Sequence, residues 1–283
     1  MPAVPHHHKS ADGDTGPAAP RPIRRRRSTY LNVALFMVFM LALAWLVIAG
    51  GRAGSYHWEW YRIPRYLFKT FDGEIYLGTL LQGLVVTLKI ALWSFPLMVL
   101  LGLTTAILST SNSVIGRLIA LVYVELIRNT PLLIQLFIFY FVLAPVIGID
   151  RYVTGILTLA AFEGAYAAEI FRAGLAAVPR GQWEAGYCVG LTTPRLYRYV
   201  VLPQAIRIIL PPMTGQSISL IKDSSIVSVI AVYELTTEGR DIIAATLLTF
   251  EVWFTVAGLY LVLTLSLSLL VGYLEERLRV GVT

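Results

Sequence analysis

Charged side chains interrupt the apolar stretches of this sequence at several points. Two of them, Glu163 and Glu169, lie in the apolar segment 152–171, and the pair Lys222-Asp223 breaks another apolar segment. A charge within a membrane span is costly and by default marks a functional position. The two glutamates are six residues apart, about 240° around a helix. They therefore face different directions and do not form an acid/base dyad.

Ion pairing is the alternative role for these charges. Glu169 is expected to pair with Arg172, and Glu125 with Arg128, because residues three apart share a helix face. Lys222 and Asp223 are neighbours, so they point in different directions, and a buried structural pair is as consistent with the sequence as a gate or a substrate contact.

Several kinds of chemistry have no motif in this sequence. It has no phosphate loop of the G-x-x-x-x-G-K-[ST] type, no G-x-S-x-G elbow and no HExxH pair. The single cysteine excludes an internal disulfide framework, and no Cys/His cluster has the spacing of metal ligands. We expect no catalytic residues, no metal and no cofactor in this chain.

The composition is that of a membrane protein. Of the 283 residues, 57% are hydrophobic and only 14% charged, whereas a soluble domain carries about 25% charged residues. The net charge of +6 does not indicate nucleic-acid binding, because six of the 23 Lys and Arg precede residue 30 and most others flank apolar runs. These cations are a membrane-topology signal.

Apolar runs predict an all-α protein with six spans. Residues 1–29 lack the apolar side chains for a core, and we expect a disordered cytoplasmic tail. Four consecutive arginines before the first span keep the N-terminus inside, so both termini are expected in the cytoplasm. An aromatic segment, 51–74, is expected on the outer surface, as is the acidic loop 234–251. The predicted spans are 31–49, 84–108, 118–149, 152–171, 208–233 and 252–274.

A polar, basic, glycine-containing loop at about 175–207 should face the cytoplasm, since four arginines lie in or beside it. Within it, Glu184, Ala185, Gly190, Val200 and Leu202-Pro203 have the spacing of the "EAA" loop. This loop resembles the signature of type I ABC importer permeases, the inner-membrane components of binding-protein-dependent transport. Gly186 replaces the second alanine, and Val200 replaces isoleucine.

Three further blocks resemble the polar amino-acid (His/Gln/Glu/Arg-type) branch of these permeases. They are 123–133, 162–174 and 220–236. The resemblance extends over 75–277 and implies a five-helix transmembrane core, here with one extra N-terminal transmembrane helix at 30–50. A leucine-, cystine- or opine-type substrate is an alternative within the same family.

The resemblance also implies the partners and site residues. A bacterial inner-membrane importer would pair this chain with a second permease subunit, identical or paralogous. It also needs two cytoplasmic ATP-binding cassette ATPases that bind ATP and Mg²⁺, and an extracytoplasmic amino-acid-binding protein; membrane lipid surrounds it. The ATPases would be contacted by Gly181, Gln182, Glu184, Ala185, Gly186, Gly190, Leu202 and Pro203, and the substrate pathway would include Glu163 and Tyr166, facing an α-ammonium group, with Lys222, Asp223 and Ser224.

An ATP-independent ion-coupled carrier or channel is the alternative function. A carrier usually shows an internal repeat of spans, and this sequence shows none. A membrane-embedded hydrolase is a third option, but no set of nucleophile and base supports it.

Overall fold

The computed structural model describes residues 33–42, 45 and 56–279, which belong to two units, Met1–Trp58 and Glu59–Thr283. In the first unit, Val33–Ala42 is an apolar helix with exposed side chains. The predicted tail at 1–29 and about half of the predicted transmembrane helix at 30–50 lie outside the described residues.

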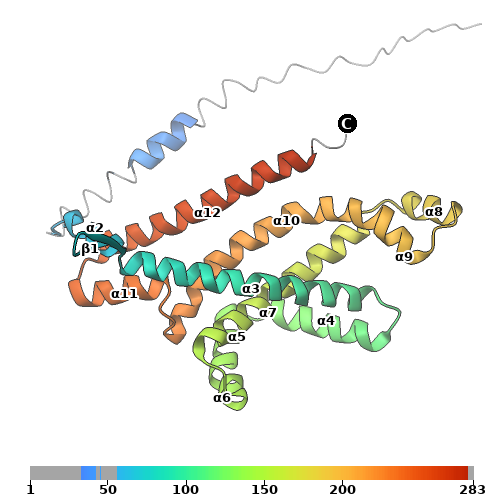
Figure 1. Cartoon of the computed structure of the whole chain (residues 1–283), viewed down its shortest axis with the longest axis horizontal. Coiled ribbons are helices and arrows are strands. Elements are labelled where there is room, and N and C mark those ends of the chain that lie inside the picture. The colour runs from blue at the N-terminus through green and yellow to red at the C-terminus, as the bar shows by residue number, and fades with distance from the viewer. Residues whose placement is uncertain (1–32, 43–44, 46–55, 280–283) are drawn as a thin grey trace, which may run out of the picture. The chain divides into compact units, whose positions relative to one another are not determined.

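The second unit is a set of helices with one small hairpin (Figure 1). α8 and α9 lie at the end of this unit opposite to the hairpin and α11. Its elements, in order, are η1 (Trp60–Arg62), α2 (Pro64–Leu67), β1 (Phe68–Phe71), β2 (Glu74–Leu77), α3 (Thr79–Thr110), α4 (Val114–Arg128), α5 (Leu132–Phe137), η2 (Ile138–Leu143), α6 (Ala144–Ile147), α7 (Arg151–Ala176), α8 (Arg180–Cys188), α9 (Thr193–Leu196), η3 (Tyr197–Val201), α10 (Leu202–Asp223), η4 (Ser224–Ile230), α11 (Leu235–Thr246) and α12 (Thr249–Arg279).

Three helices among the described residues are long and apolar enough to cross a membrane: α3, α7 and α12. Val114–Arg128 and Leu132–Ile147 form a fourth candidate, a pair bent by 107°. The sequence predicted one continuous span here. The bend lies before Pro131, where the proline ring disfavours helical geometry at Thr130 and the chain has to change direction. α10 is interrupted by charge, as the sequence indicated, and ends at Asp223.

α3 and α7 pack along each other at the centre of this unit. Gly102 permits the close approach, since a Cβ atom there would lie 2.7 Å from the Cβ of Ala167. Ser94 donates a hydrogen bond to the carbonyl of Ile156 (3.2 Å), and Tyr123 on α4 donates to that of Ala161 (2.6 Å). The centre of the bundle thus combines small-residue packing with interhelical hydrogen bonds, as is common in membranes.

The segments 51–74 and 234–251, both predicted on the outer surface, hold two elements that the sequence analysis did not predict. β1 and β2 pair antiparallel, with Phe71 opposite Glu74, around a turn in which Asp72 and Gly73 both have positive φ. An Asp-Gly pair is a strong signal for a two-residue hairpin, so this hairpin could have been predicted. The supposed loop at 234–251 is mostly helical and contains α11.

Glu234 explains how α11 begins. Its carboxylate accepts hydrogen bonds from the backbone N–H groups of Thr236 and Thr237, both 2.9 Å away, and therefore caps the helix. Tyr260 on α12 donates to the same carboxylate at 2.9 Å, and Thr87 on α3 lies 3.4 Å away. One buried acidic residue thus connects three helices.

Candidate functional site

Helix α8 presents the residues of the EAA-like loop. Gly181, Gln182, Glu184 and Ala185 are all exposed on it. Gln204 at the start of α10 donates to the side chain of Gln182 at 3.3 Å. Glu184 and Ala185 are exposed to solvent in the part of the chain that the structure describes.

Two glycines shape this loop for different reasons. Gly186 is buried, and a Cβ atom there would collide with the side chain of Leu196, itself fully buried. The departure from the EAA pattern therefore lets α8 lie close to α9. Gly190 has φ +78°, and Leu191 donates its backbone N–H to the carbonyl of Gly186 at 3.1 Å. This closes α8 in the way that C-terminal glycines close helices.

The inner face of α8 is anchored to the helix that follows. The rings of Trp183 and Tyr197 meet edge to face, with centroids 5.1 Å apart. Tyr197 begins η3, which runs directly into α10, where Pro203 occupies the first turn beside Leu202. The coupling-loop residues predicted from the sequence thus lie on one continuous structure, α8 to α10.

The charged residues of the predicted substrate pathway meet at a second place. Glu163 on α7 is fully buried, and Gln216 on α10 donates a hydrogen bond to one of its carboxyl oxygens. The other oxygen, Oε1, has no hydrogen-bond partner among the described residues. Lys222 and Asp223 interact electrostatically with this carboxyl group. The structure therefore brings Glu163 together with the end of α10.

Gln216 was missed by the sequence analysis, although a signal for it exists. It lies seven residues before Asp223 in α10, close to two helical turns, so the two share a face. A polar amide two turns from a charged pair in an apolar helix is therefore a candidate for the same site.

Two other predicted pathway residues lie in different surroundings. The ring of Tyr166 packs against Phe162, with centroids 5.3 Å apart, and the Arg128 guanidinium lies 5.5 Å from its centre. Ser224 is buried and donates to the carbonyl of Ile221 at 2.7 Å. The structure thus assigns both side chains contacts other than Glu163.

The ion pairs differ in part from those predicted. Arg172 donates two hydrogen bonds to Glu169, at 3.1 and 2.7 Å. Arg128 does not pair with Glu125; it lies 3.9 Å from Glu169. The carboxylate of Glu125 instead accepts from Asn129 at 2.8 Å. Asn129 at the end of α4 thus gives Glu125 a local partner, and Arg128 turns toward α7.

No group of three His, Cys, Asp or Glu residues that could hold a metal ion occurs among residues 33–42, 45 and 56–279.

Residues 98–280, which include α8 and the Glu163 cluster, match the family described as "Binding-protein-dependent transport system inner membrane component". The match extends over more than half of the chain. The chain belongs to this family. Its members are permease components, and this permease shares their all-α membrane fold.

Individual relatives match along most of their length. The permease is 37% identical to the glutamine transport system permease protein GlnP of Escherichia coli (strain K12) over 204 residues, which are 71% of this chain and 93% of the relative. It is 39% identical to the L-cystine transport system permease protein TcyB of Bacillus subtilis (strain 168), over 69% of this chain and 85% of the relative.

A solved structure supports the same fold. The "Crystal structure of an amino acid ABC transporter with histidines" has a chain with a TM-score of 0.66 and 39% identity to this permease. The match extends over 70% of this chain and 94% of that one.

Proposed function

We propose that this permease is the membrane subunit of an ATP-driven, binding-protein-dependent importer of polar amino acids. The observation that carries the proposal is the exposed helix α8, anchored to α10, in a chain 37% identical over 93% of a glutamine permease. A glutamate/aspartate permease among the relatives agrees with a polar amino acid as the class of substrate, and a cystine permease is of the alternative class named above.

The proposal requires partners that supply energy and substrate. Two cytoplasmic ATPases bind ATP and Mg²⁺ and contact the exposed face of α8, including Glu184 and Ala185. A second permease subunit, identical or paralogous, completes the pathway, and an extracytoplasmic protein delivers the amino acid. The complex lies in the bacterial inner membrane with both termini of this chain inside, the helix at 30–50 spanning, and 75–277 as the transport domain.

The substrate would meet the Glu163 cluster. The free Oε1 atom of Glu163 provides an acceptor for an α-ammonium group, and Asp223 adds a second carboxylate nearby. Lys222 is exposed beside them and is a partner for an α-carboxylate. A buried acceptor without a donor is costly, so a bound ammonium group would be stabilised here.

Coupling follows from the continuity of η3 and α10. Trp183 and Tyr197 fix α8 to η3, and α10 carries Gln216 and Asp223 at its far end. When the ATPases close, they displace α8, and α10 moves with it because the two helices are joined through η3. The movement changes the distance between Gln216 on α10 and Glu163 on α7, which alters the substrate site.

Purification from native membranes in mild detergent, followed by transport assays in proteoliposomes, tests this function. We expect an ATPase with a phosphate loop to co-purify, and radiolabelled glutamine to accumulate only with ATP and the binding protein. Accumulation driven by an ion gradient, with the chain alone, would instead identify a carrier.

Variants of α8 refine the test. Glu184→Ala and Gly190→Asp are expected to abolish uptake while membrane insertion continues, since both alter the exposed face and the end of α8. Asn112→Ala, an exposed change in the turn before α4, is the matched control and should transport normally. Normal uptake by both α8 variants would contradict the coupling role.

A further inference from the structure

A cavity lined by both charged and apolar side chains lies apart from the Glu163 cluster, between α11 and the segment formed by α2 and β1. Its volume is about 340 Å³, near the lower end of the range for small-molecule sites (about 300–1,000 Å³). Residues 65–79 on one wall precede residues 98–280, which match the family model, so this wall lies outside the matched residues.

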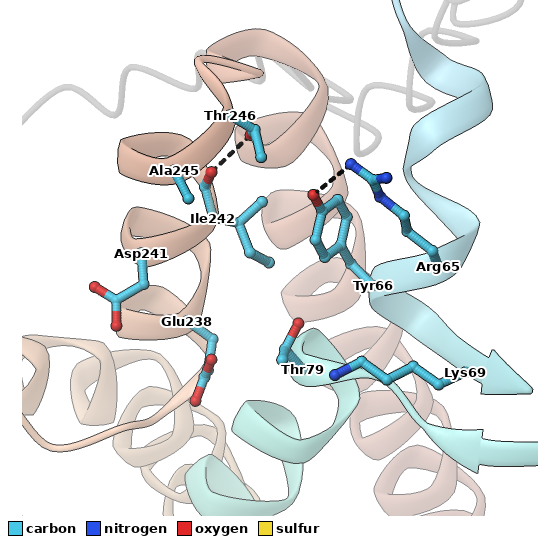
Figure 2. A pocket seen from close by; sticks show the side chains of 9 residues that line it. All are labelled: Arg65, Tyr66, Lys69, Thr79, Glu238, Asp241, Ile242, Ala245 and Thr246. Atoms are coloured by element: carbon cyan, nitrogen blue, oxygen red, sulfur yellow. Dashed lines mark hydrogen bonds between the residues drawn. The ribbon is translucent and has the colours of Figure 1, made fainter. Parts of the chain in front are cut away.

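Acidic and basic residues line different sides of this cavity. Figure 2 shows Glu238 and Lys69 on either side of Thr79, with Arg65 on the same side as Lys69, while the carboxylate of Asp241 points away from them at the outer side of α11. None of the ion pairs between the described residues joins the two walls. The charges are thus separated by space that a ligand with both charges would fill.

The basic wall has hydrogen-bond donors that a ligand could use. The Arg65 guanidinium lies 4.9 Å from the centre of the Tyr66 ring and donates to the Tyr66 hydroxyl at 2.8 Å. A guanidinium has five N–H donors, so this contact orients the group and leaves a pair of donors for a carboxylate. Lys69 adds a second cation, which already acts electrostatically on Glu238.

Of the two acidic residues, Glu238 is half-buried and Asp241 is exposed. Burial raises the pKa of Glu238, and Asp241 raises it further, while Lys69 opposes both effects. A cation bound beside Glu238 would offset the repulsion from Asp241. The hydroxyl oxygen of Thr79 is buried and has no hydrogen-bond partner among the described residues. Ile242 and Ala245 give the cavity an apolar side.

We propose that this cavity is a second amino-acid site, which binds the free zwitterion on the extracytoplasmic face. The α-carboxylate lies against Arg65 and Lys69, and the α-ammonium group against Glu238, with Asp241 adding negative charge nearby. Thr79 supplies a further hydrogen bond, and the aliphatic part of the ligand contacts Ile242. The site is separate from the Glu163 cluster and lies at the start of α3, where Thr79 is the first residue of the helix.

Equilibrium binding of radiolabelled L-glutamine to the purified, assembled transporter tests the proposal, without ATP and without the binding protein. We expect two classes of site. Lys69→Met and Asp241→Asn should both weaken glutamine binding at the same class of site, by about tenfold or more. Lys69→Met removes a hydrogen bond to a charged group, and Asp241→Asn removes a negative charge near the α-ammonium group. Glutamine α-amide and N-acetylglutamine, which lack one of the two charges, should not compete at this class.

Matched variants separate the two sites. Lys89→Met removes a cation that lines a different cavity, and Glu74→Gln removes an exposed carboxylate on the hairpin; neither should affect binding. Glu163→Gln should leave the class that depends on Lys69 intact. If Glu163→Gln abolishes all binding while Lys69→Met and Asp241→Asn bind normally, the second site does not exist, although the proposed transport function stands.

A protein ligand is the other outcome that overturns the proposal. If the permease shows no glutamine binding that depends on Lys69 or Asp241, and the same variants weaken docking of the binding protein, the charged walls form a protein interface. Docking of the binding protein to the same purified complex is measured in surface binding assays. Loss of glutamine binding with unchanged docking supports the amino-acid site.

Discussion

Glu163 links two helices through one buried carboxyl group. Its carboxyl group is fully buried, one oxygen accepts from Gln216, and the other has no partner among the described residues. Surface ion pairs such as Glu169–Arg172 contribute only about 0–1 kcal/mol. The two glutamates of α7 therefore differ in their surroundings, in keeping with the different roles predicted from the sequence, a substrate contact for Glu163 and an ion pair with Arg172 for Glu169.

Glu163→Gln is expected to reduce amino-acid uptake by roughly 10- to 100-fold, the cost of losing a hydrogen bond to a charged group. The variant keeps the shape of the side chain, so association with the ATPase should be unchanged. Uptake in proteoliposomes and co-purification of the ATPase measure the two effects. Glu169→Gln, on the same helix, is the control and should transport within about twofold of the wild type.

If Glu163→Gln prevents assembly, the residue is structural and the pathway assignment is wrong. If it transports normally, the substrate does not use this carboxylate. Gln216→Ala distinguishes these cases further, because it removes the donor and leaves Glu163 in place.

At the scale of elements, glycine and alanine determine how closely helices pack. Gly102 on α3 lies against Ala167 on α7, and Gly174, near the end of α7, lies against Ile209 on α10. Such contacts replace the hydrophobic effect, which cannot hold helices together within lipid. They also explain why the block at 162–174 is rich in small residues.

Gly102→Val is expected to destabilise the permease by about 1–3 kcal/mol, because the added side chain must push α3 away from α7. Thermal unfolding of the purified protein in detergent, followed by size-exclusion chromatography, measures the loss. Gly258→Ala is the matched control, since nothing lies within 4 Å of a Cβ atom at this position on α12. If the two variants are equally stable, the contact between Gly102 and Ala167 does not determine how closely α3 and α7 pack.

The long helices were predictable from the sequence, but their ends and interruptions were less so. α3 and α12 follow from uncharged runs, because the length of such a run is itself the signal. The bend before Pro131 and helix α11 were missed, since their causes are a local proline effect and a capping carboxylate, Glu234. Pairings between helices, such as Glu163 with Gln216, depend on the rotation of each helix and cannot be read from spacing within one segment.

For the whole molecule, the proposals place α8 and the charged cavity by Lys69 on opposite sides of the membrane. Within the second unit, α8 lies at the end opposite to the hairpin. The arginines around α8 favour the cytoplasm, and the acidic residues of α11 lie at the hairpin end. Charge and geometry therefore give the same orientation.

Cys188 allows this orientation to be tested without introducing a cysteine into α8. It is the only cysteine in the sequence and is exposed at the end of α8. A membrane-impermeant maleimide should modify it in inside-out vesicles and not in intact spheroplasts. Bound ATPase should slow the modification, because it covers the face that carries Glu184.

Two variants complete the experiment. Cys188→Ser provides the background and should give no labelling from either side. Asp72→Cys in that background, at the exposed turn of the hairpin, should react in spheroplasts only. Labelling of Cys188 from outside would show that the chain has the reverse orientation, in which the coupling loop could not contact cytoplasmic ATPases. Labelling from inside, at a rate that bound ATPase does not change, would retain the orientation and contradict docking on α8.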